Sequence, residues 1–175
     1  MNRLKKNDKA IPFKFDDYLG NEIDLLNYKG KKVMLTFFRD ASCPFCNLRV
    51  NQLIKRHAEF KEKGIEIISF FASSKKEILK YVGKQKAPFT IIADPKLEMY
   101  KKYGIEESIA GMYKAMLKPL KMMEVMISGF FNMNSMKERA LIPADFLIDE
   151  NQTIYKVYYG KNFGDHLPIE EIINW

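Results

Sequence analysis

"VMLTFFRDASCPFC", residues 33–46, decides the fold because it joins an apolar run directly to a helix start. Its first six residues are continuously apolar and of strand length, which is typical of a central strand buried on both faces. Pro44 suits the first turn of a helix, where its missing N–H has no helical partner, and Ser42 is the expected N-cap. The two cysteines of the chain, Cys43 and Cys46, are therefore expected at a strand-to-helix junction.

Strand and helix patterns alternate along the rest of the chain. We expect a hairpin or extended segment before this stretch, and after it a helix that begins at Pro44 and is closed by Gly64. A strand is expected at 65–72, a helix at 73–85, a strand at 88–94 and a helix at 95–104. The chain then ends with a hairpin that has residues 149–152 at its tip and a short helix near 167–175. Repeated strand and helix units imply parallel strands joined by right-handed crossovers. The predicted fold class is therefore α/β.

Residues 105–140 differ from this pattern, since they hold seven of the ten methionines. Met112, Met116 and Met123 keep helical spacing, which predicts two short helices hinged near Pro119. This segment either packs on the sheet as core or forms an adaptable apolar wall for a substrate or a second subunit. With no linker in sight, we expect one domain over 1–175 with a helical, methionine-rich insertion.

The composition excludes several classes of protein. A chain of 175 residues that is 47% hydrophobic can bury one sizeable core. Its net charge of +7 comes from scattered lysines without a basic stripe, so we expect no nucleic-acid partner. No apolar run approaches the ~20 residues of a membrane span, and the N-terminus lacks a signal peptide, so we expect no membrane association and a cytoplasmic location. Thiols stay reduced there, and a close cysteine pair is then more often catalytic or metal-binding than a permanent disulfide.

The spacing of the two cysteines favours reversible redox chemistry. Residues i and i+3 in a helical turn have Cα atoms about 5 to 6 Å apart, within the range that a disulfide accepts. Cys43 is expected to be exposed at the positive end of the helix, with a lowered pKa, and Arg39 adds positive charge nearby. Cys46, one turn into the helix, is expected to be shielded and to keep its proton.

The same spacing also fits two structural roles. The cysteines could be ordinary buried apolar residues that fall in this pattern by chance. They could also be half of a zinc site, but structural zinc takes four ligands and the chain has no other cysteine. His57 is expected beside the apolar stripe of its helix, and His166 in a polar loop. We therefore expect no metal and no cofactor.

Three blocks of sequence resemble one known family. They are "FKFDDYLGNEIDLLNYKGKKVMLTFFRDASCPFC" at 13–46, "PFTIIADPKLEMYKKYGI" at 88–105 and "IPADFLIDENQTI" at 142–154. In this order and spacing they resemble the alkyl hydroperoxide reductase and thiol-specific antioxidant family, the peroxiredoxin-like branch of the thioredoxin fold. The resemblance implies a thioredoxin-like fold, with a central mixed β-sheet flanked by helices.

The resemblance also assigns roles at the site. Cys43 matches the attacking cysteine of peroxiredoxins, but the positions of their peroxide-polarising residues hold Thr36, Asp40 and Pro143 here. Pro143 instead matches the cis-proline that faces the C-x-x-C motif in thioredoxins, so we expect a cis bond opposite the Cys43 sulfur. The buried acid of thioredoxins is replaced by Phe37, so that route for deprotonating Cys46 is expected to be absent.

The implied function is that of a thiol-dependent oxidoreductase with catalytic residues Cys43, Cys46, Pro143 and Arg39. Cys43 would attack a disulfide and Cys46 would resolve the mixed disulfide. One alternative is a peroxiredoxin-type antioxidant that reduces hydroperoxides through a sulfenic acid on Cys43. A further alternative is a redox sensor or binding protein. The implied partners are a thiol reductant such as thioredoxin or glutathione, a disulfide or hydroperoxide substrate, and a second copy in a homodimer.

Overall fold

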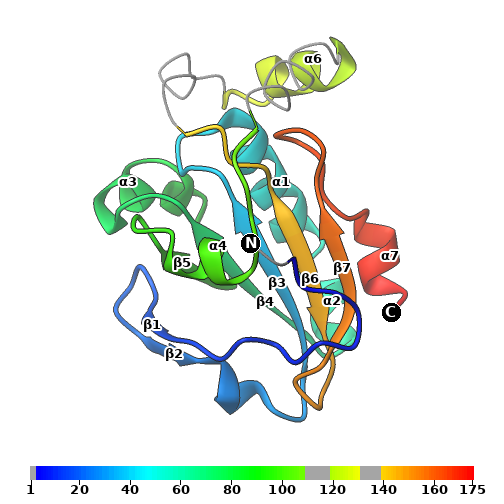
Figure 1. Ribbon diagram of the computed structural model, residues 1–175. Coiled ribbons are helices and arrows are strands. Elements are labelled where there is room, and N and C mark those ends of the chain that lie inside the picture. Colours follow the sequence, from blue (N-terminus) through cyan, green and yellow to red (C-terminus); the bar gives the residue numbers. More distant parts are fainter. Residues whose placement is uncertain (1–2, 109–118, 131–138) are drawn as a thin grey trace.

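The computed structural model describes residues 3–108, 119–130 and 139–175, with a five-stranded sheet at the centre (Figure 1). The strands are β3 (Lys32–Phe38), β4 (Ile65–Phe71), β5 (Thr90–Ala93), β6 (Ala144–Ile148) and β7 (Ile154–Tyr159). Their order in the sheet is β5-β4-β3-β6-β7. β3, β4 and β5 are parallel, whereas β6 is antiparallel to both β3 and β7. The predicted strands, crossovers and C-terminal hairpin are thus confirmed.

The central strand β3 is buried on both faces, as its continuous apolar run predicts. Val33, Leu35 and Phe37 belong to one hydrophobic cluster, while Met34 and Phe38 belong to the other. Successive side chains of a strand point to opposite faces, so a strand between two clusters is buried at successive positions, and even its polar residue Thr36 is fully buried.

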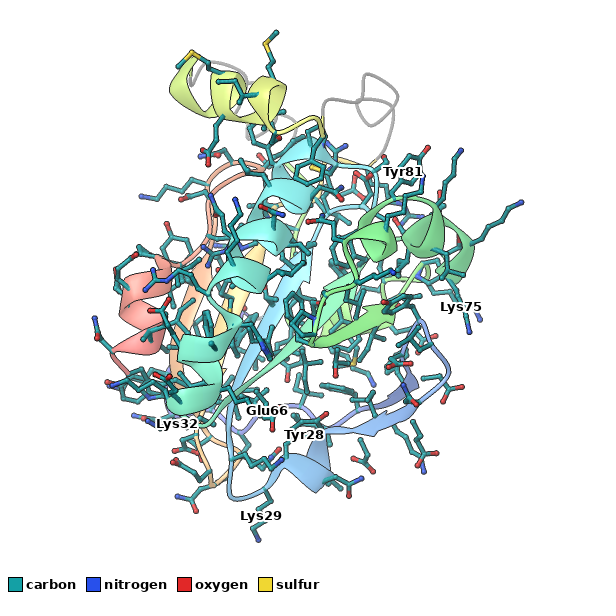
Figure 2. The ribbon with its side chains drawn as sticks, turned by 180° about the vertical axis from the view of Figure 1, so that it is seen from behind. Tyr28, Lys29, Lys32, Glu66, Lys75 and Tyr81 are labelled. Carbon is teal, nitrogen blue, oxygen red and sulfur yellow. The ribbon has the colours of Figure 1, made fainter. Side chains whose placement is uncertain are left out.

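Helices and a small hairpin cover these two faces (Figures 1 and 2). The cluster of Met34 and Phe38 is closed by α1 (Pro44–Lys55), α2 (His57–Glu62), α3 (Lys75–Lys80) and α7 (Ile169–Ile173). The opposite cluster is closed by α4 (Glu98–Lys102), the 3-10 helix η1 (Leu25–Tyr28) and the two-stranded hairpin of β1 (Lys14–Asp16) and β2 (Glu22–Asp24). The layers therefore place α1, which carries the cysteines, directly on the central strands.

Three predicted helices differ from the observed ones at their ends. The helix expected from Pro44 to Gly64 divides at Arg56, whose backbone leaves helical geometry, into α1 and α2. The helix expected at 73–85 begins with a capping box between Ser74 and Glu77 and stops at Tyr81, after which η2 (Val82–Gln85) follows.

The third helix, expected from Pro95, begins later as α4. Leu97 has a φ of 59°, which interrupts helical geometry ahead of α4. The carboxylate of Asp94 then accepts hydrogen bonds from the backbone N–H groups of Glu98 and Met99, at 2.9 and 2.8 Å. This side-chain cap fixes the helix start three residues after the proline.

The methionine-rich segment contributes α6 (Pro119–Ile127), which lies beside α1 at one end of the molecule (Figure 1). The side chains of Met123 and Met126 are exposed, by 54% and 65%, so the core interpretation is wrong for Met123. The reason is that α6 lies against α1 and not on a face of the sheet. Met112 and Met116, in the other predicted helix, lie outside the described residues. Across the described ranges, no helix has the length and apolar character needed to cross a membrane.

Candidate active site

The turn between β3 and α1 is organised by the carboxylate of Asp40. Its Oδ1 accepts hydrogen bonds from the backbone N–H of Ser42 at 2.9 Å and from the Ser42 hydroxyl at 2.6 Å. The backbone N–H of Cys43 donates to the carbonyl of Asp40 at 3.2 Å. Cys43 is therefore the N-cap residue of α1, and the prediction that Ser42 holds this place is wrong because its hydroxyl is bound to Asp40.

Side chains from neighbouring elements hold this turn in place. The Ser73 hydroxyl accepts the N–H of Ala41 at 2.9 Å. The Asn47 amide nitrogen donates hydrogen bonds to the carbonyls of Ala41 and Cys43, at 2.8 and 2.9 Å. The Asn47 Oδ1 in turn accepts a hydrogen bond from the Gln85 amide at 3.0 Å. The turn that carries Cys43 is thus fixed to Ser73, between β4 and α3, and to Gln85 of η2 through buried and partly buried hydrogen bonds.

Both thiols are buried. Cys43 is 1% exposed and Cys46 is fully buried, in the same cluster as Phe38 and Ala41. The prediction that Cys43 is exposed is therefore wrong. The reason is that the Asp40 turn uses its polar groups internally and joins the hydrophobic cluster instead of ending in solvent.

The pKa values of the two thiols nevertheless differ in the predicted direction. Burial alone would raise the pKa of Cys43, but a hydrogen bond from the Cys46 thiol and the charge of Arg39 outweigh burial and Asp40, so the pKa is lowered. For Cys46, burial, the hydrogen bond to Cys43 and the charge of Cys43 all raise the pKa. The Cys46 thiol thus donates a hydrogen bond to the Cys43 sulfur, and the attacking role of Cys43 stays a prediction.

Arg39 interacts electrostatically with Cys43, as the sequence predicts, and also with Cys46, and it is only 3% exposed. Its Nε donates to Asp40 Oδ2 at 2.6 Å, and its guanidinium carbon lies 4.5 Å from the centre of the Phe163 ring. Burial opposes its charge, but the negative charges of Cys43 and Asp40 raise its pKa overall. The guanidinium is thus a permanent positive charge inside the site. Its catalytic role stays a prediction.

Pro143 lies just ahead of β6, but the predicted cis bond is wrong: no peptide bond among the described residues is cis. The backbone is paired on both sides of this proline. Ile142 donates its N–H to the carbonyl of Glu106 at 3.2 Å, and the Pro143 carbonyl accepts the N–H of Gly160 at 2.9 Å. An extended chain in a β ladder accommodates the trans form. The bond before Pro143 thus lacks the predicted cis geometry, and a catalytic role for this residue stays a prediction.

A second buried polar cluster lies on the α1 face of the sheet, around Asp145 of β6. Its carboxylate accepts hydrogen bonds from the Thr36 hydroxyl at 2.6 Å and from the backbone of Leu167 at 2.7 Å, and His166 Nδ1 lies 3.1 Å from Oδ1. Arg49 of α1 donates to the carbonyl of Leu167 at 2.6 Å. Burial would raise the pKa of Asp145, but His166 and Arg49 lower it overall. The carboxylate is therefore held in its charged form.

The sequence reasoning missed this cluster. Phe37, expected in place of the buried acid of thioredoxins, packs in the hydrophobic cluster on the opposite face of the sheet from the cysteines. A different carboxylate, Asp145, stands opposite Thr36 in the next strand. The available signal was an aspartate inside the apolar strand "ADFLI". His166 lies in the loop between β7 and α7, as expected, but its side chain is only 3% exposed and contacts Asp145.

His57 and the possible metal ligands add little to the site. His57 begins α2, and its ring lies 6.3 Å from the ring of Phe89, at the edge position expected from sequence. Among the described residues, no group of three or more His, Cys, Asp or Glu side chains is arranged to hold a metal ion.

Comparisons with known proteins agree with this geometry. The model of the AhpC/TSA family matches residues 7–157. The chain is 25% identical over 113 residues to peroxiredoxin Bcp of Escherichia coli, covering 63% of this chain and 72% of that protein. It is 31% identical over 99 residues to the thiol-disulfide oxidoreductase ResA of Halalkalibacterium halodurans, covering 56% of each.

Among solved structures, a yeast mitochondrial 1-Cys peroxiredoxin is similar in fold, with a TM-score of 0.71 and 18% identity. The match covers 97% of this chain and 73% of that one. The sheet order, the buried cysteine pair at the start of α1 and these matches lead to one conclusion. The chain belongs to the AhpC/TSA family and is a thiol-dependent oxidoreductase with a thioredoxin-like fold.

Proposed function

We propose that the protein catalyses thiol–disulfide exchange, with Cys43 as the attacking and Cys46 as the resolving cysteine. The observation that carries the proposal is the opposite shift of two neighbouring pKa values, lowered for Cys43 and raised for Cys46. An exchange cycle needs one thiolate that attacks and one thiol that is held in reserve beside it.

Atoms and electrons balance in this cycle. The Cys43 thiolate forms a bond to one sulfur of a substrate disulfide, and the other sulfur leaves as a thiolate that takes up a proton. Cys46 then loses its proton and attacks the Cys43 sulfur, which releases the second substrate thiol. The protein ends as the Cys43–Cys46 disulfide, and the substrate is reduced by two electrons.

Hydroperoxide reduction is the second candidate, and the position of Arg39 supports it. The family's usual polarising residues are replaced here, yet a buried guanidinium lies beside Cys43. In this reaction the Cys43 thiolate attacks the peroxide and becomes a sulfenic acid, while the alcohol or water leaves with a proton. Cys46 then condenses with the sulfenic acid, water leaves, and the same disulfide forms.

A reductant must regenerate the two thiols in either cycle. We propose thioredoxin or glutathione, the systems named for the similar yeast peroxiredoxin. The cytoplasm is the proposed location, because a reducing compartment keeps such a pair ready to react. The homodimer stays a prediction.

Single-turnover oxidation of the reduced protein distinguishes disulfide exchange from hydroperoxide reduction. Hydroxyethyl disulfide is expected to oxidise it faster than hydrogen peroxide does. Cys46→Ser is expected to stop at a mixed disulfide on Cys43, visible by mass spectrometry, because nothing remains to release it. Fast reaction with peroxide and dimedone labelling of Cys43 in that variant would favour the peroxidase instead. Activity retained in Cys43→Ser would contradict both.

A further inference from the structure

Among the grooves that border α1, two differ in charge. The first, about 450 Å³ in volume, is lined by the basic residues Arg49, Lys55 and Arg56 and by the acidic residues Glu124 and Glu170. Arg56 is paired with Glu170 at 2.5 Å, so acidic residues offset most of the positive charge there. The second lies between the start of α1 and the segment of α3 and η2, and has a volume of about 490 Å³.

The second groove is uniformly basic. Lys80 and Lys84 line it, and none of its described lining residues is acidic. Both lysines are exposed, and neither forms an ion pair with another residue that the structure describes. Lys80 Nζ lies 5.1 Å from the centre of the Tyr81 ring, which also lines the groove. Uncompensated positive charge in a concave site attracts anions.

This groove is joined to the attacking cysteine. Ser42, the residue before Cys43, lines it, and so does Asn47, whose amide donates to the Cys43 carbonyl at 2.9 Å. Figure 2 shows Tyr81 toward the end of the molecule that carries α6 and the start of α1. A ligand in the groove therefore lies next to the turn that carries the reactive thiol.

The size and lining of the groove suit a small molecule. Its volume is within the range of about 300 to 1,000 Å³ that is usual for small-ligand sites. Tyr81 and Phe130 supply aromatic surface, and the lysines supply charge. These features fit a peptide-sized compound that carries carboxylates.

We propose that this lysine groove binds the anionic part of a low-molecular-weight disulfide, and so selects carboxylate-bearing disulfides as substrates. The proposal rests on the proposed disulfide exchange and names its substrate class. The exchange steps are unchanged: Cys43 attacks one sulfur, an anionic thiol leaves, and Cys46 releases the second. Cys43 is 1% exposed, so its turn must open before the sulfurs meet, and the lysines hold the substrate beside that turn.

The test compares an anionic with a neutral disulfide in single-turnover oxidation. The substrates are glutathione disulfide and hydroxyethyl disulfide, and the variant is Lys80→Gln/Lys84→Gln. The matched control is Lys75→Gln/Lys76→Gln, which removes two exposed lysines from the first turn of α3; Figure 2 shows Lys75 well apart from Tyr81.

The groove variant is expected to react about five to twenty times more slowly with glutathione disulfide, since each rim charge contributes a few-fold. Its rate with hydroxyethyl disulfide should stay within about twofold of the parent protein, and the control variant should match the parent with both substrates. Equal losses with both disulfides, or no loss with either, would overturn the proposal.

Binding of S-methylglutathione, which cannot exchange, separates this proposal from the proposed function. Isothermal titration is expected to show binding to the parent protein and the control variant, and much weaker binding to the groove variant. Binding without oxidation by either disulfide would refute the exchange reaction but support the groove. Oxidation without binding would refute the groove alone. If the groove variant bound S-methylglutathione normally and lost only its reaction with oxidised thioredoxin, the lysines would serve a protein partner and the proposal would fail.

Discussion

Replacement of Arg39 by Gln is expected to raise the pKa of Cys43, because it removes a buried positive charge that stabilises the thiolate. Arg39 is 3% exposed, so solvent screens its charge poorly, and that charge is one of the causes that lower the pKa of Cys43. Each pKa unit of the rise corresponds to about 1.4 kcal/mol of lost stabilisation of the thiolate. At a pH below the parent inflection, each pKa unit lowers the thiolate fraction tenfold, and above both inflections the fraction stays near one.

The ultraviolet absorbance of the thiolate, followed against pH in the reduced protein, measures this shift. In the parent protein the first inflection is expected below the ordinary cysteine value of about 8.5. Arg39→Lys keeps the positive charge and should recover most of the shift. Arg56→Gln, at a partly exposed arginine that is held by Glu59 and Glu170, is the control and should leave the inflection unchanged. An unchanged inflection in Arg39→Gln would refute the electrostatic explanation.

Three predictions concern stability. Asp145→Asn should lower the free energy of unfolding in urea by about 3 to 5 kcal/mol, because it breaks a buried charge cluster; a loss below about 1 kcal/mol would contradict this. In the parent protein the contribution of Asp145 is fully present above about pH 4 and is lost as the pH falls through its lowered folded pKa, which acid titration of unfolding should show. Gly160→Ala should cost about 2 kcal/mol or more in the same urea assay, because its Cβ would lie 2.4 and 2.9 Å from two carbonyl oxygens; an unchanged midpoint would mean that the loop relaxes freely. Met123→Gln and Met126→Gln should each change stability by less than about 0.5 kcal/mol, since both side chains are exposed; a larger loss would restore the core interpretation.

The features that the sequence predicts correctly depend on local patterns. The continuous apolar run of β3 requires burial on both faces, and this fixes the strand at the centre of the sheet. Pro44 marks the first turn of α1, and that placement puts Cys43 at the helix start with a lowered pKa. In each case the deciding interactions lie within a few residues of the motif.

The features that the sequence does not predict depend on contacts between distant segments. The burial of Cys43 requires the turn to be tied to Ser73 and, through Asn47, to Gln85. The trans bond before Pro143 follows from pairing with residues 106–108, which no local pattern reveals. The charged state of Asp145 likewise depends on His166 and Arg49, which the fold brings together around it.

The charges that set the pKa of Cys43 also set how strongly the disulfide oxidises its partners. The thiolate exists only in the reduced protein, so every group that stabilises it favours reduction and raises the reduction potential. Arg39 acts in this direction, and Asp40 acts against it. At a pH where Cys43 stays ionised, a shift of one pKa unit corresponds to about 30 mV for a two-electron couple. Arg39→Gln should therefore lower the potential in proportion to the rise in the pKa of Cys43, and Asp40→Asn should raise it. The reduction potential of the double variant should lie between those of the two single variants. Equilibration in glutathione redox buffers measures all three potentials. A potential that did not change in Arg39→Gln while the pKa of Cys43 rose would mean that the variant also destabilises the disulfide form, and the thiolate charge would then no longer explain the redox balance of the pair.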